Sequence, residues 1–226
     1  AMISLAYELT ESGNYAAVMV SVEVGAAFPN NVDAAELAIL SAWEGATQFY
    51  LPDSLRPTAW AEGPSGRRLG AALSSWSKQS PRPLVLLIDE IDSLQDDVLL
   101  SVLRQLRDGY PSRPESFPHS LALVGLRDVR DYKIASGGSS RLNTASPFNI
   151  KVKSLTLQNF THSDVAELYG QHTADTGQIF TEEAIAQAFH LSQGQPWLVN
   201  ALAKEAVEDI IDDVSIPIEL KHIHEA

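Results

Sequence analysis

The chain has no cysteine among its 226 residues. Disulfide bonds, thiol catalysis and thiolate metal sites are therefore excluded, and the composition suits the reducing cytoplasm. No window approaches the roughly 18 uninterrupted apolar residues that a membrane-spanning helix needs. The first residues also lack the basic region and apolar core of a secretory signal. We therefore expect a cytoplasmic protein that does not cross a membrane.

Positive charge is scarce, since 16 Lys and Arg residues face 29 Asp and Glu residues and the formal net charge is −13. This balance disfavours non-specific binding to nucleic acid and to anionic membranes. The 45% hydrophobic and 20% charged fractions are those of an ordinary globular protein. The length suits one α/β domain followed by a small second domain.

Apolar runs alternate with helical patterns over the first two thirds of the chain. The expected strands lie at residues 15–25, 84–88, 120–126 and 149–157, and the expected helices between them at 30–49, 69–80 and 96–108. From Thr161 onward only helical patterns follow, at 163–173, 181–191 and 196–211. Alternating strands and helices predict an α/β fold with a mostly parallel sheet flanked by helices, followed by a small helical domain. We place the domains at residues 1–158 and 159–226.

One strand pattern ends in two adjacent acids. In "PLVLLIDEID", the apolar residues 84–88 are followed directly by Asp89 and Glu90. Ligands of open α/β sheets bind at the carboxyl ends of the strands, where one carboxylate can hold magnesium and its neighbour can activate water. The plain alternative is a strand that emerges into solvent, where acidic residues are common.

Four segments, in this order, resemble AAA+ and STAND-type P-loop ATPases. "LVLLIDEID" resembles the Walker B segment, and "LALVGLRD" is similar to the sensor-one strand, with Arg127 at the sensor position. "SSRLNTASPFNI" resembles the segment that often carries an arginine finger, and Arg141 matches it. "LSQGQPWLVNALA" resembles the GxP motif of STAND lids, with Gly194 and Pro196 near the adenine.

This resemblance covers nearly the whole chain and implies a P-loop NTPase-like fold with a winged-helix-like lid. It also implies ATP and Mg²⁺ as ligands, with Asp89 on the metal, Glu90, Arg127 and Arg141 as catalytic residues, and a nucleotide-dependent switch. "SPFNIKVKSLTLQNFT" in particular is similar to bacterial AAA-like ATP-binding proteins. Arg127 is equally compatible with a solvated ion-pair cluster with its acidic neighbours, and for Arg141 an ordinary surface arginine is the simpler interpretation.

The phosphate-binding half of such a site is missing from the sequence. No GxxxxGK[ST] string occurs, although this motif supplies the backbone N–H groups and the lysine that bind the phosphates. The nearest candidate, "EGPSGRRLG" at residues 62–70, follows no apolar strand. The uncapped pattern at residues 2–13 resembles the latter part of the helix that follows the phosphate loop. We therefore expect a chain cut just after that loop, with weak or no ATP binding and no turnover of its own.

A missing central strand would leave unpaired backbone groups, so we expect re-pairing of the sheet, recruitment of another segment, or a strand-completing dimer. Protein partners and a homo-oligomer are both compatible with a sheet that lacks its central strand. Other interpretations remain open: a helicase fragment with "DEID", a nuclease that uses Asp89, Glu90 and Asp92, or an inactive ATPase-like module that binds regulatory partners. His222 and His224 could bind a metal, although a solvated terminal helix is the simpler interpretation.

Overall fold

A computed structural model of the chain describes residues 2–126 and 153–226. The chain divides into two compact units, Ala1–Ser154 and Leu155–Ala226, which are described separately below. The sequence placed this division at residue 158. No helix of the described residues is long and apolar enough to cross a membrane.

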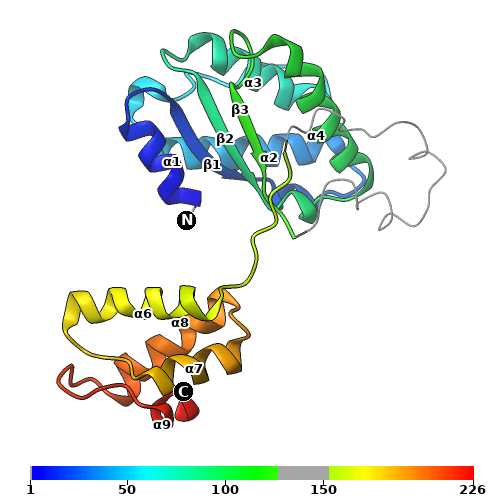
Figure 1. Cartoon of the computed structure of the whole chain (residues 1–226). Helices are drawn as coiled ribbons and strands as arrows, with labels where there is room; N and C mark the ends of the chain where they lie inside the picture. Colours follow the sequence, from blue (N-terminus) through cyan, green and yellow to red (C-terminus); the bar gives the residue numbers. More distant parts are fainter. Residues whose placement is uncertain (1, 127–152) are drawn as a thin grey trace. The chain divides into compact units, whose positions relative to one another are not determined.

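Unit 1 contains a three-stranded sheet in the order β1-β2-β3 (Figure 1). Its strands are β1 (Ala16–Ser21), β2 (Leu84–Asp89) and β3 (Ser120–Leu123). Both pairings are parallel, with Val18 opposite Leu86 and Leu86 opposite Leu121. Parallel neighbours need long crossovers, and these hold α2 (Val32–Tyr50), α3 (Arg68–Gln79) and α4 (Asp96–Gly109). The predicted α/β fold, with a parallel sheet flanked by helices, is confirmed.

Helices cover both faces of this sheet (Figure 1). α1 (Met2–Glu11) packs on the face that carries Ala17, Val85 and Leu87. The alternate strand residues, including Val18 and Leu86, belong to the larger core on the other face. α2, α3 and α4 supply most of the rest of that core, in which the Trp43 and Trp76 rings are fully buried. Successive strand side chains point to opposite faces, so the continuous apolar runs in the sequence reflect burial on both sides.

Side chains satisfy part of the free edge of β1. The Thr10 hydroxyl accepts a hydrogen bond from the Ala17 N–H at 3.0 Å and donates one to the Ala17 carbonyl at 3.0 Å. The Trp43 indole N–H donates to the Ser21 carbonyl at 2.9 Å. Bonds of this kind lower the tendency of an edge strand to pair with another chain. At the other edge of the sheet, β3 pairs only with β2 among the residues that the structure describes.

Unit 2 is helical and has its own core. Its helices are α6 (His162–Thr176), α7 (Glu182–Ser192), α8 (Pro196–Lys204) and α9 (Leu220–Glu225), with a π-helical segment at Glu205–Ile210. α6 begins at a capping box of Thr161 and Asp164, an arrangement that satisfies free N–H groups at a helix start. Burial raises the pKa of Tyr169 to about 12, and its hydroxyl donates to the Val199 carbonyl at 2.8 Å.

Two sequence predictions need correction here. The fourth strand was expected at residues 149–157, but its described part, residues 153–157, forms no strand. The helix expected at 196–211 keeps α-helical geometry only to Lys204 and continues as the π-helical segment. Both patterns were weak: the strand alternates poorly, and the α-helical period does not distinguish a π-turn.

Candidate functional site

The acidic pair lies where the parallel strands of unit 1 end. Asp89 is the last residue of β2 and is in register with Ser21, the last residue of β1. Glu90 follows with φ of 57° and ψ of 34°, the left-handed conformation that non-glycine residues rarely adopt. The Glu90 N–H donates to Asp89 Oδ1 at 3.0 Å, and the Ser93 N–H donates to the Glu90 carbonyl at 3.0 Å. Local hydrogen bonds therefore hold a conformation that costs about 1 kcal/mol or more.

The surroundings of Glu90 favour its protonated form. Desolvation by the neighbouring protein raises the pKa of Glu90, and the charges of Asp89, Asp92 and Glu23 raise it further. A carboxylate with a raised pKa is a better proton acceptor near neutral pH than an ordinary surface glutamate. The site therefore concentrates negative charge and basicity at one end of the sheet.

Asp92 links the acidic loop to the end of the third strand. Its Oδ2 accepts a hydrogen bond from the Leu126 N–H at 3.3 Å, and the Ile91 N–H donates to the Val124 carbonyl at 3.2 Å. Asp92 Oδ1 and the Ser93 hydroxyl are buried without a partner among the described residues. The loop after β2 is thus fixed to the residues that immediately precede Arg127.

The donor set suits magnesium held mainly by water. Among the residues that the structure describes, no group of three or more His, Cys, Asp or Glu side chains could hold a metal ion. Asp89, Glu90 and Asp92 therefore do not form the three-carboxylate site that a nuclease would need. Mg²⁺ usually keeps several waters and takes only one or two carboxylates. One oxygen of Asp89 bonds Glu90, so within the described part of the chain the other oxygen is left for such a contact.

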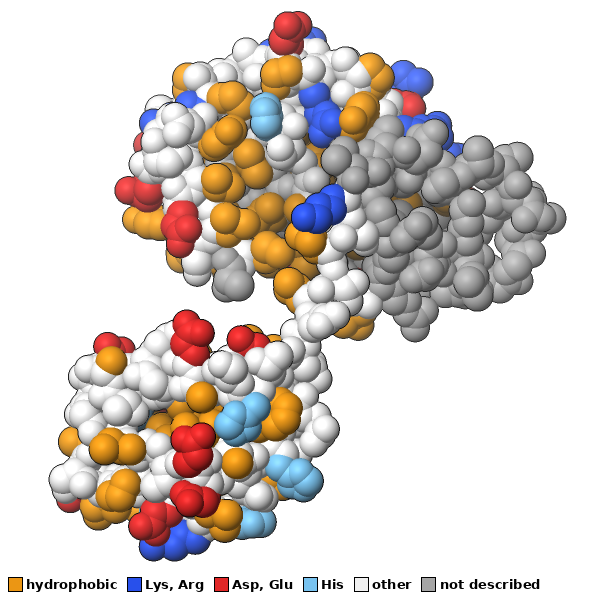
Figure 2. All heavy atoms as spheres, in the orientation of Figure 1, with side chains coloured by type: hydrophobic (Ala, Val, Ile, Leu, Met, Phe, Trp, Pro, Cys, Tyr) orange, Lys and Arg blue, Asp and Glu red, His pale blue; other side chains and the backbone are white. Residues whose placement is uncertain are grey.

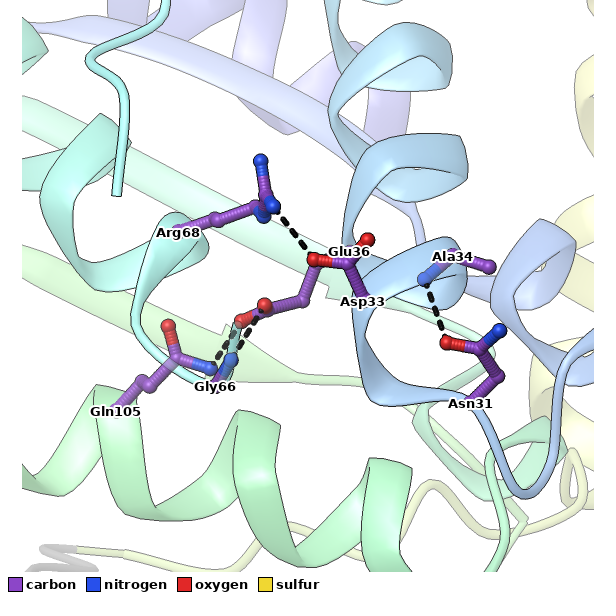
Figure 3. Close-up of polar contacts among 7 residues, drawn as sticks. All are labelled: Asn31, Asp33, Ala34, Glu36, Gly66, Arg68 and Gln105. Atoms are coloured by element: carbon purple, nitrogen blue, oxygen red, sulfur yellow. Dashed lines mark hydrogen bonds and ion pairs between the residues drawn. The ribbon is translucent and has the colours of Figure 1, made fainter. Parts of the chain in front are cut away.

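The glycine-bearing turn before α3 is already occupied by a side chain of the protein itself (Figure 3). The Gly66 N–H donates to Glu36 Oε2 at 2.8 Å, and Gln105 Nε2 donates to Glu36 Oε1 at 2.6 Å. Gln105 Oε1 in turn accepts from the Gly70 N–H at 2.9 Å. Glu36 is completely buried, so an internal carboxylate takes the place that an anion would need. Figure 3 also shows Arg68 paired with Asp33 on the same side of the turn.

One signal for this network was overlooked in the sequence, namely a lone acidic residue in the apolar run "AAELAIL" at residues 34–40. A charge on the buried face of a helix needs a partner. The partners themselves could not be identified, because Gly66 and Gln105 lie 30 and 69 residues from Glu36 along the chain.

Gly194 and Pro196 have clear local roles in unit 2. Gly194 has φ of +72°, and a Cβ atom there would lie 1.9 Å from the Phe160 carbonyl oxygen. The Phe160 N–H donates to the Gly194 carbonyl at 2.7 Å. Pro196 opens α8, a position where its missing N–H costs nothing. Trp197 follows with its side chain 71% exposed.

The remaining predicted site residues, Arg127 and Arg141, lie outside the described residues. The structure thus brings Asp89 and Glu90 together in unit 1, and it places Gly194 and Pro196 at one helix start in unit 2. A metal site at His222 and His224 was only the less simple interpretation of the sequence, and the surroundings of the two side chains differ. His222 is buried and its Nδ1 accepts from the Glu219 N–H at 3.0 Å, whereas His224 is exposed.

No protein-family model and no curated protein matches the chain. Among solved structures, the chain is similar to a RuvB mutant of Thermotoga maritima, with 16% identity and a TM-score of 0.46 over 99% of this chain and 66% of that one. It is also similar to the Thermotoga maritima RuvB Holliday junction branch migration motor, with 18% identity, a TM-score of 0.47, and coverage of 99% and 65%. The chain thus spans slightly less than two thirds of these proteins. At this low level of similarity, no activity and no site residue of these proteins can be assigned to the chain.

Proposed function

We propose that the chain is the core and lid of an AAA+/STAND-like ATP-binding protein that acts as a nucleotide-dependent switch. The observation that carries this proposal is the acidic pair at the carboxyl end of the middle strand. There, Glu90 is held in a left-handed conformation beside Asp89 at the edge where strand ends of a parallel sheet meet. Ligands of open parallel sheets bind at this edge.

Residue roles follow from the resemblance and from this geometry. Asp89 would hold Mg²⁺ through its free oxygen, and Glu90 would orient and deprotonate the attacking water. Arg127 would sense the γ-phosphate and Arg141 would act as an arginine finger. Bound magnesium would neutralise charge on the phosphates.

The adenine would lie near Gly194 and Pro196, as the GxP resemblance implies. A change of nucleotide would then alter contacts of the helical unit, since such switches act through elements with two stable arrangements.

This chain by itself should bind ATP weakly or not at all, with hydrolysis confined to a longer parent protein. The sequence holds no GxxxxGK[ST] string. The glycine-bearing turn ahead of α3 has its Gly66 N–H bonded to Glu36. Asp89 and Glu90 can organise magnesium and water, but they offer no donors for a triphosphate.

The second candidate is a catalytically inactive ATPase-like module that works as a protein-interaction or regulatory domain. The Gly66 turn favours this inactive module for the present chain, because its N–H is already bonded to Glu36. Under this alternative the acidic pair would have no nucleotide to act on, and Glu90 would be dispensable.

Calorimetric titration with Mg-ATP, together with phosphate release at millimolar ATP, tests the proposal. We expect a dissociation constant well above the micromolar range, and sub-micromolar binding would contradict it. In a longer parent, hydrolysis that disappears in Glu90→Gln but persists in the exposed control Glu115→Gln supports the ATPase. A parent whose phosphate release equals background and is unaltered by Glu90→Gln supports the inactive module instead.

A further inference from the structure

Most of the net negative charge of the protein is in unit 2. Residues 155–226 contain twelve Asp and Glu residues and two Lys residues, which gives −10 of the total −13. All twelve acidic side chains are exposed. Figure 2 shows red acidic atoms next to orange apolar ones on the visible face of this unit. A field of one sign on a small unit attracts positively charged partners and speeds their association.

Exposed apolar side chains accompany this charge where the chain before α7 meets the chain before α9. Ile179 is 57% exposed, Val214 52%, Ile216 42% and Leu220 41%. The Ile218 N–H donates to the Ile179 carbonyl at 2.8 Å, and this bond joins the chain before α7 to the chain before α9. We call the following residues the acidic–apolar surface: Ile179, Glu208, Asp209, Asp212, Asp213, Val214, Ile216 and Leu220. Apolar side chains rimmed by polar ones are typical of protein-binding surfaces.

The loop that presents Val214 and Ile216 is firmly held. Gln178 is 1% exposed, and its Nε2 donates to the Ile216 carbonyl at 3.1 Å and to the Asp213 carbonyl at 3.4 Å. Asp213 Oδ1 accepts from the Ser215 N–H at 2.9 Å and from its hydroxyl at 2.7 Å. The apolar side chains are therefore displayed on an ordered backbone. A preformed surface loses little conformational entropy when a partner binds.

We propose that the acidic–apolar surface docks a protein segment with Lys or Arg on one side and apolar residues on the other, that is, a basic amphipathic segment. Charge complementarity selects this occupant. A second copy of the chain carries the same −13 charge and would be repelled, as would nucleic acid or an anionic membrane. This role goes beyond the nucleotide switch and does not depend on ATP binding.

A fluorescein-labelled amphipathic helix of 18 Lys and Leu residues serves as the probe, and a scrambled peptide of the same composition serves as its control. Fluorescence anisotropy should show micromolar binding of the amphipathic peptide and binding about tenfold weaker for the scrambled one. Affinity should fall at high salt, because exposed charges are screened.

Two pairs of substitutions separate the apolar and the charged contributions. Val214→Ser with Ile216→Ser should weaken binding about tenfold, since each removes exposed apolar area that the peptide would cover. Asp209→Asn with Asp212→Asn should weaken it about threefold at low salt. The matched control Glu8→Gln with Glu11→Gln removes the same charge from α1 of unit 1 and should leave the affinity nearly unchanged.

Several results would overturn the proposal. One is equal affinity for the two peptides, which would indicate attraction by net charge alone. Another is unaltered binding by a Val214→Ser, Ile216→Ser protein whose circular dichroism shows it is folded. Loss of affinity in the control as large as in Asp209→Asn, Asp212→Asn would contradict a localised surface. A concentration-dependent dimer in sedimentation that disappears in Ile216→Ser would identify a second copy as the occupant instead.

Discussion

Glu36 allows the sharpest test of how unit 1 is held together. Its carboxylate accepts one hydrogen bond from the Gly66 N–H and one from Gln105 Nε2, and it is completely buried. In Glu36→Ala both donors lose their acceptor, and a cavity forms between α2 and α4. Unpaired buried donors cost about 1–3 kcal/mol each, so we expect unit 1 to lose about 3–5 kcal/mol of unfolding free energy.

Glu36→Gln refines the test because it keeps the shape of the side chain and replaces one acceptor oxygen with an NH₂ group. The amide offers one oxygen and one NH₂ group, so one of the two donors from Gly66 and Gln105 must face another donor. Rotating the Gln105 amide moves the conflict to the Gly70 N–H, which now bonds Gln105 Oε1. One unsatisfied group therefore persists in every arrangement, and we expect a loss of about 1–3 kcal/mol.

The assay is urea unfolding followed by tryptophan fluorescence in a Trp197→Phe background. The remaining tryptophans, Trp43, Trp60 and Trp76, all lie in unit 1, so the transition reports that unit alone. The control Glu44→Gln changes an exposed acid of the same helix and should shift the free energy by less than about 0.5 kcal/mol. A Glu36→Ala protein within 0.5 kcal/mol of wild type, or about as stable as Glu44→Gln, would refute the reasoning.

Three further predictions concern unit 2 and the acidic site. Gly194→Ala should destabilise unit 2 by more than about 2 kcal/mol in thermal unfolding, because its Cβ would clash with the Phe160 carbonyl and the backbone is left-handed; an unchanged melting temperature would contradict this. Folding raises the pKa of Tyr169 to about 12, so the neutral phenol contributes stability to the folded state below pH 10. This contribution should be lost between pH 10 and 12, and Tyr169→Phe should show no such loss. Asp89→Asn should lower the pKa of Glu90, measured by carboxyl NMR titration, because it removes a neighbouring negative charge.

Elements with a strong local signal could be predicted from the sequence. Asn31 and Thr181 are residue types that favour helix starts, and their side chains cap α2 and α7 by accepting from the Ala34 and Ala184 N–H groups at 3.1 and 3.3 Å. The three apolar runs that became strands are nearly continuous because helices cover both faces of the sheet. Gly13, which follows the end of α1, has φ of +81°, which glycine adopts without strain.

Features that depend on distant partners could not be predicted. The lone acid in the apolar run of α2 indicated a buried charge, but only the folded chain brings the Gly66 turn and Gln105 to it. The order of the loop at 211–217 likewise depends on Gln178, a residue with no distinguishing sequence pattern. Periodicity reports which face of an element is buried, and it contains no information about which polar groups meet across the core.

The conformation of Glu90 helps to decide between the two interpretations of the acidic pair. One interpretation is a site for magnesium and water, and the other is a strand that emerges into solvent. A strand that merely emerges into solvent has no need for a left-handed glutamate, since an extended residue costs less. Here the Ser93 N–H bond to Glu90 and the Ile91 N–H bond to Val124 fix the turn from both sides. The turn also keeps Glu90 close to three other carboxylates, which raise its pKa. Backbone strain and charge repulsion at Glu90 both lower the stability of the fold. Such costs are typical of residues in functional sites. This favours the magnesium-and-water role proposed for Asp89 and Glu90 over a solvated strand end.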